Sequence, residues 1–137
     1  MFDLSREQAR QHFIRAWQQR ESPVQDALAK KIIDIASQHP EYHQWLNEEQ
    51  WQQDFLPEQD NPYLHMSLHL ALTEQLDIDQ PPGIRTAYQR LITKWQDSHH
   101  VQHIMMDCLM QAIWQSQRDN TEFSVTNYFD CLKRSGG

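Results

Sequence analysis

The chain has 137 residues, a formal net charge of −7 and only three glycines, two of which end the sequence. This length suits one domain with a single core, expected over residues 1–134 ahead of a flexible tail at 135–137. The lone interior glycine, Gly83, excludes the glycine-rich loops that bind phosphate, and it argues against the tight hairpins of an all-β fold.

Apolar residues recur at helical spacing along nearly the whole chain, and capping residues mark the expected helix starts. Ser5 with Gln8 forms a capping box, and Ser22-Pro23 places proline at the first helical position. The predicted helices cover, in chain order, about residues 5–17, 22–36, 39–46, 61–76, 82–95, 97–113 and 124–132. Residues 48–60 lose the period and are expected to be mostly loop. The fold class is therefore predicted to be all-α, a compact bundle of six or seven short helices.

Bulk properties argue against a membrane, a nucleic acid and an oxidising compartment. The chain has no apolar run of about eighteen residues, and no apolar stretch follows a basic start as in a signal peptide. Its acidic balance without a basic stripe argues against nucleic acid as a partner. Two cysteines, Cys108 and Cys131, are too few for a disulfide scaffold. Both are expected to be reduced thiols in a cytoplasmic protein.

The eight histidines are not scattered evenly, because six of them form three pairs spaced four residues apart, where chance gives fewer than one. The pairs are His39 with His43, His65 with His69, and His99 with His103. Residues i and i+4 are neighbours on a helix, so two imidazoles of a pair can reach one metal ion. Each pair lies in the first two turns of its predicted helix, where the positive helix end favours a neutral ring that can bind metal.

These pairs predict a metal-binding protein. Short connections make neighbouring helices antiparallel, so the fourth and sixth helices are expected to run parallel with their histidines at one level. The first-choice ligands are His65, His69, His99 and His103. Asp107 continues the last pair as a fifth or supporting ligand, and His39 with His43 forms a further candidate pair. Imidazole with carboxylate suits zinc or iron.

The sequence leaves the chemistry of such a site open. Four histidines around one ion would make a structural site, whereas three with a water would leave a position for hydrolytic or redox chemistry. Structural roles are the competing interpretation: His65 and His69 border an apolar face, and His39 is placed to cap the helix at Pro40. Whether the chain is an enzyme is likewise open.

Two other functions follow from other features. The aperiodic segment before Asn61 carries Trp51, Phe55 and Leu56, which a non-enzymatic interaction protein could present to a partner chain. In the competing interpretation these side chains cover the bundle as a buried loop. In the third hypothesis, clustered helix N-termini and protonatable histidines bind an anionic ligand such as a phosphate or a carboxylate.

Four motifs together resemble a known family. They are HPEYH from His39, NPYLHMSLH from Asn61, DQPPGIR from Asp79 and HIMMDC from His103. In this order they are similar to a proteobacterial family of small cytoplasmic proteins catalogued as a domain of unknown function, number 1841. The likeness runs from about Met1 to Arg134. It implies no activity, cofactor or site residues, because the family has no established chemistry to carry over.

Overall fold

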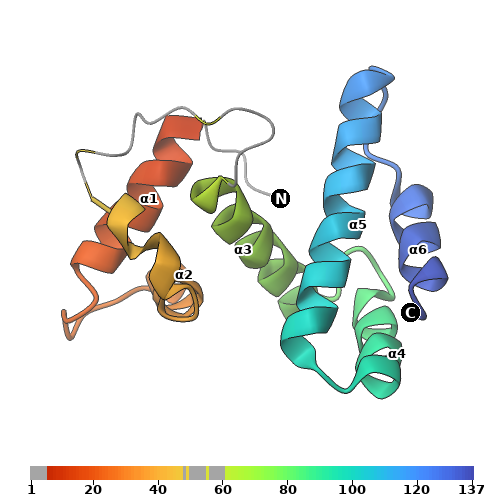
Figure 1. Ribbon diagram of the computed structural model, residues 1–137, viewed down its shortest axis with the longest axis horizontal. Coiled ribbons are helices and arrows are strands. Elements are labelled where there is room, and N and C mark those ends of the chain that lie inside the picture. Colours follow the sequence, from red (N-terminus) through yellow and green to blue (C-terminus); the bar gives the residue numbers. More distant parts are fainter. Residues whose placement is uncertain (1–5, 48, 50–54, 56–60) are drawn as a thin grey trace. The chain divides into compact units, whose positions relative to one another are not determined.

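The computed structural model describes residues 6–47, 49, 55 and 61–137, and over these residues the chain forms helices and no strand (Figure 1). The helices are α1 (Arg6–Gln18), α2 (Ala27–Ser37), η1 (Pro40–Trp45), α3 (Pro62–Ile78), α4 (Ile84–Trp95), α5 (Ser98–Arg118) and α6 (Val125–Arg134). η1 is a 3₁₀-helix and the other elements are α-helices. The predicted all-α fold class is confirmed. None of these helices combines the length and the apolar character that crossing a membrane requires.

Three of the predicted helix starts are confirmed by side chains that accept hydrogen bonds from the first turn. Asn61 Oδ1 accepts from the Leu64 amide at 3.2 Å ahead of α3. Asp97 Oδ1 accepts from the His100 amide at 3.1 Å and caps α5. Ser124 Oγ accepts from the Asn127 amide at 3.1 Å and caps α6. These oxygens satisfy amides that have no partner inside the helix, which is why short polar residues mark a start in the sequence.

The predicted start of the second helix is wrong by four residues. The Ser22 hydroxyl accepts from the Val24 amide at 3.3 Å, within a turn, and α2 begins only at Ala27. Asp26 is the cap, and its Oδ1 accepts from the Ala29 amide at 2.7 Å. Serine bonds its own local backbone as readily in a turn as at a helix start, so Ser22-Pro23 alone did not distinguish the two. Ser5 lies outside the described residues, as does most of the predicted loop at 48–60.

Replacing Asp26 should measure the strength of this cap. Asp26→Ala is expected to lower the free energy of unfolding by about 1 kcal/mol, because the Ala29 amide loses its acceptor at the start of α2. Asp26→Asn, which keeps an acceptor oxygen, is the control and should stay within about 0.5 kcal/mol of the parent. Urea unfolding followed by circular dichroism measures both, and equal losses in the two variants would contradict the cap.

The chain divides into two compact units, and the division falls inside α3 between Leu70 and Ala71. In the first unit α1 packs against α2, and α2 against η1. The buried core of this unit consists of Phe13, Ile14, Ala16, Ile32, Ile35, Ala36, Tyr42, Leu46, Tyr63, Met66 and Leu70. The expectation that residues 1–134 behave as one domain stays a prediction.

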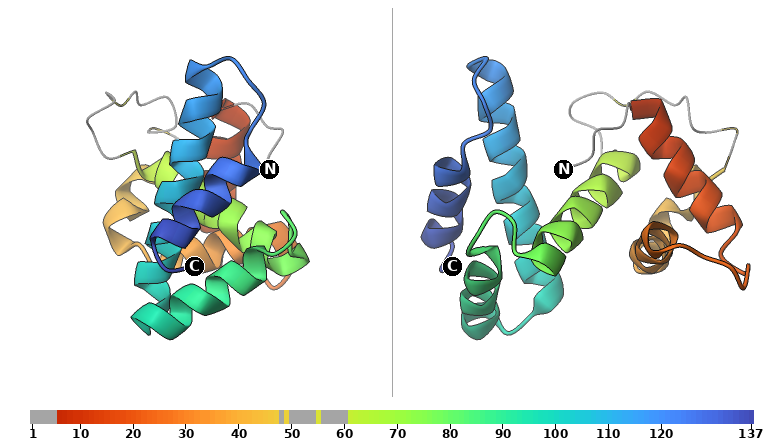
Figure 2. Two further views of the ribbon diagram at one scale, coloured as in Figure 1. Left: turned by 90° about the vertical axis from the view of Figure 1, so that its right-hand side faces the viewer. Right: turned by 180° about the vertical axis from the view of Figure 1, so that it is seen from behind.

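In the second unit α5 packs against both α4 and α6, and α4 also touches α6 (Figure 2). Tyr128 of α6 is fully buried, and its hydroxyl donates to Gln75 Oε1 at 2.8 Å, which ties α6 to the C-terminal half of α3. Burial raises the pKa of the Tyr128 phenol far above its usual value, so this hydroxyl keeps its proton as a donor.

The two cysteines correct a prediction. Cys108 of α5 and Cys131 of α6 form a disulfide, with their Cα atoms 5.6 Å apart, so the expectation of two reduced thiols is wrong. Each cysteine lies on the apolar stripe of its own helix, and nothing within one helix indicates which residue the stripe will face. The packing of α6 on α5 joins the two, although they are 23 residues apart in sequence.

Candidate metal centre

His39 is held in a defined orientation where α2 passes into η1. Only 3% of its surface is exposed, and its Nδ1 lies 2.8 Å from the carbonyl oxygen of Ile35. A carbonyl oxygen only accepts, so Nδ1 carries a proton, and the buried Nε2 is the ring atom that can offer a lone pair to a metal. Histidines that bind metal are commonly oriented by such a bond from the other ring nitrogen to a backbone carbonyl. His39 is also the N-cap of η1, as weighed from the sequence: its backbone carbonyl accepts from the Tyr42 amide at 2.9 Å, while its side chain makes no capping bond.

His65 and His69 lie one turn apart in the N-terminal half of α3. Their Nε2 atoms are 3.1 Å apart and share a hydrogen bond, so one ring donates and the other accepts. His69 is 3% exposed and His65 is partly buried. The i, i+4 spacing brings the two rings together on one face of the helix, as the sequence predicts.

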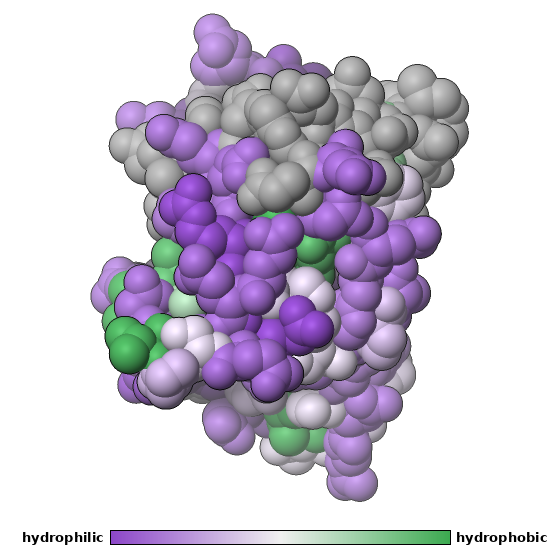
Figure 3. Space-filling view, turned by 90° about the vertical axis from the view of Figure 1, so that its left-hand side faces the viewer, coloured by the Kyte–Doolittle hydropathy of each residue, from purple (hydrophilic) through white to green (hydrophobic). Residues whose placement is uncertain are grey.

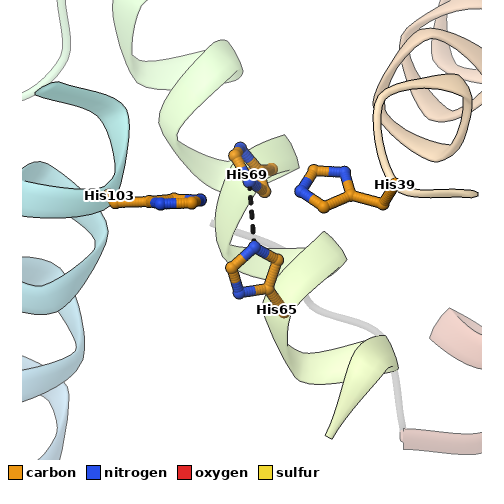
Figure 4. Close-up of side chains that lie close together, drawn as sticks. All are labelled: His39, His65, His69 and His103. Atoms are coloured by element: carbon orange, nitrogen blue, oxygen red, sulfur yellow. Dashed lines mark hydrogen bonds between the residues drawn. The ribbon is translucent and has the colours of Figure 1, made fainter. Parts of the chain in front are cut away.

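The three rings form a cluster in the first unit, which we call the His39–His65–His69 cluster (Figure 4). The ring centroid of His39 lies 5.0 Å from that of His65 and 4.7 Å from that of His69. One ring nitrogen of each histidine can be chosen so that all lie within 4.8 Å of one another. Tyr42 closes one side, because its buried ring stacks on His39 at 5.5 Å and meets His65 edge-on at 5.6 Å.

The cluster offers the donors that zinc and other first-row divalent ions take from proteins. In a tetrahedral site with metal–nitrogen bonds of about 2.0–2.1 Å, two ligating nitrogens lie about 3.3 Å apart. The 3.1 Å between His65 and His69 is already close to that separation. An ion between them would take the place of the shared proton, and a ring nitrogen of His39, now within 4.8 Å of the other two, would need to approach by up to about 1.5 Å.

The remaining candidate ligands come from other elements of the chain. His43 points away from the cluster: its Nε2 donates to the Ala36 carbonyl at 2.7 Å, and its ring packs on Trp17 at 4.2 Å. His99 and His103 lie on α5 in the second unit, with ring centroids 4.3 Å apart. His103, which Figure 4 also draws, is partly buried, and His99 and Asp107 are exposed.

The sequence places His39 in a pair with His43, and helix geometry explains why the two rings part. His39 is the N-cap of η1, with φ −128° and ψ 66° outside the helical region, and η1 is itself a 3₁₀-helix, so the two rings are not related by the about 40° turn of an α-helical i, i+4 step. Tyr42 was not a candidate at all. It follows His39 by three residues, and the stacking of its ring on that of His39 at 5.5 Å is a contact that only the structure shows.

The comparison with protein families settles the classification of the chain. Residues 5–134 match the family model described as a domain of unknown function, DUF1841. The chain belongs to this family. The match covers nearly the whole chain and confirms the resemblance carried by the four motifs. No curated protein and no solved structure is significantly similar to this DUF1841 protein.

Proposed function

We propose that this DUF1841 protein binds a divalent metal ion, zinc or iron, through His39, His65 and His69. The observation that carries the proposal is the bond from His39 Nδ1 to Ile35 O. It holds the lone pair of a buried imidazole toward two further imidazoles that already lie at ligand-to-ligand distance. A histidine that served packing alone would need no second imidazole at this separation.

The donor set favours zinc among the common ions. Three neutral imidazoles suit zinc, copper, iron and nickel, whereas calcium and magnesium require oxygen donors. Zinc tolerates three protein nitrogens with a fourth ligand of another kind. Such an ion keeps its full charge of two, because imidazoles bring no negative charge, and an anionic fourth ligand such as hydroxide would lower the net charge buried in the site.

The identity of the fourth ligand is a separate prediction. The sequence hypothesis adds His103 and His99 of α5, with Asp107 in support. If His103 binds the ion, the site is closed and structural; if a water or hydroxide does, the ion can act as a Lewis acid. We expect His103→Ala to separate these cases, because loss of a fourth imidazole lowers zinc affinity by more than about 100-fold and loss of a bystander does not.

Metal analysis and titration test the proposal. The purified protein is expected to bind about one equivalent of zinc or iron, and His69→Ala to lower the affinity by more than about 100-fold. His43→Ala and His12→Ala are the matched controls: each removes an imidazole outside the cluster and should leave the affinity unchanged. Less than about a tenth of an equivalent in the native protein, after incubation with either ion, would end the proposal.

The alternative of a partner-binding module finds less support among the described residues. Trp51 and Leu56 lie outside them, and Phe55 is partly buried against Trp45 and Tyr63, at 5.3 and 6.3 Å between ring centroids. This position agrees with the covering role weighed for that side chain. Apart from the atoms in grey, the face drawn in Figure 3 is mostly hydrophilic, with green confined to small separate areas.

A further inference from the structure

The disulfide of the second unit borders a small cavity. Cys108 and Cys131 are 2% and 8% exposed, and both line a space of about 110 Å³ between α5 and α6. The other lining residues are Gln111, Ala112, Gln115, Asn127, Asp130 and Arg134. A water needs roughly 10–15 Å³ of such space, so the cavity can admit a group of several heavy atoms, such as a thiol on its methylene carbon.

The cavity opens to solvent beside the disulfide, and most of its wall is polar because Gln111, Asn127, Asp130 and Arg134 are exposed residues. Gln111 Oε1 lies 3.9 Å from Cys131 Sγ, and Gln115 and Asn127 contribute further amides. Arg134 adds a cation and Asp130 an anion. These groups suit a small polar molecule that carries amides and a carboxylate, and the guanidinium favours a thiolate over a thiol in its neighbourhood.

We propose that the Cys108–Cys131 bond is a thiol–disulfide exchange centre that reacts with a small-molecule thiol of the glutathione type through this cavity. The thiolate attacks the Sγ of Cys131, the more exposed of the two cysteines. A bond forms between the incoming sulfur and Cys131, the Cys108–Cys131 bond breaks, and Cys108 leaves as a thiolate that takes a proton from water.

A second small-molecule thiol completes the exchange. The second thiolate attacks the sulfur of the first small molecule in the mixed disulfide. Cys131 then leaves as a thiolate and is protonated. Two small thiols are thereby oxidised to one small disulfide, and the two electrons reduce the protein bond to two thiols. The reverse sequence restores the bond between α5 and α6. The whole site lies in the second unit, so this proposal stands or falls independently of the metal proposal.

The test uses the full-length oxidised protein and reduced glutathione. We expect a glutathione adduct on Cys131, located by peptide mass spectrometry, to form at a rate proportional to glutathione concentration while circular dichroism shows the chain still folded. Gln115→Trp, which places a large side chain in the cavity and leaves both cysteines unchanged, should slow the reaction by about 10-fold or more. Arg134→Gln should slow it several-fold, and Arg118→Gln, whose guanidinium pairs with Asp119 outside the cavity, should not.

Results of three kinds would overturn the proposal. The first is a rate that does not depend on glutathione concentration, because reduction would then wait for global unfolding. The second is an adduct on Cys108, or an unchanged rate in Gln115→Trp. The third is a chain that fails to form the Cys108–Cys131 bond when it is equilibrated with oxidised glutathione.

Discussion

Saturating zinc is expected to raise the free energy of unfolding of the protein by about 4 kcal/mol when free zinc is a thousand times the dissociation constant. The stabilisation arises because the ion binds the folded chain only: His39 and the α3 pair come from separate elements and are brought together by folding. Urea unfolding with and without zinc, followed by circular dichroism, measures the effect. Iron(II) under anaerobic conditions is the parallel measurement.

Two variants separate ligand loss from general damage. His39→Ala with His69→Ala should abolish the zinc-dependent stabilisation, whatever the double variant does to the stability without metal. His43→Ala removes a partly buried histidine that bonds to Ala36, so it should lower the basal stability and keep the full zinc-dependent increment. An increment of equal size in the double variant would show that zinc acts elsewhere.

The second large effect is expected at Tyr128. Tyr128→Ala should lower the free energy of unfolding by about 3–5 kcal/mol, because a fully buried aromatic ring is removed from between α6 and its neighbours. Tyr128→Phe keeps the ring and leaves only Gln75 Oε1 without its donor, so a loss of about 1–2 kcal/mol is expected. Urea unfolding followed by tryptophan fluorescence gives both values, and similar losses in the two variants would mean that the ring contributes little.

Tyr128 also predicts a pH dependence. Burial raises the pKa of its phenol, so the folded state holds this proton after the unfolded chain has begun to release it near pH 10. The contribution to stability is complete below that pH and declines as the pH rises above it. Parent minus Tyr128→Phe, measured between pH 8 and 11, should isolate the decline. A difference that stays constant over this range would rule out the raised pKa.

Local residues predict the secondary structure well where a cap and the following turn belong to the same few residues. Asp97 and Ser124 each accept a hydrogen bond from the amide three residues later, so the starts of α5 and α6 do not depend on any distant contact. The error at Ser22 has the same origin, since a hydroxyl that can cap a helix can also close a turn. The helix begins after Asp26 instead, because the residues that follow Asp26 carry the face that α2 packs against α1.

The sequence by itself determined the all-α class and the pairing of His65 with His69, because both depend on the turn of a single helix. The i, i+4 step lies within α3 and brings the two Nε2 atoms to 3.1 Å without help from another element. Only the tertiary structure decided that His39 joins them while His43 turns to Trp17, and that Cys108 meets Cys131. Those contacts depend on how helix faces pack, and many different packings satisfy the same apolar stripes equally well.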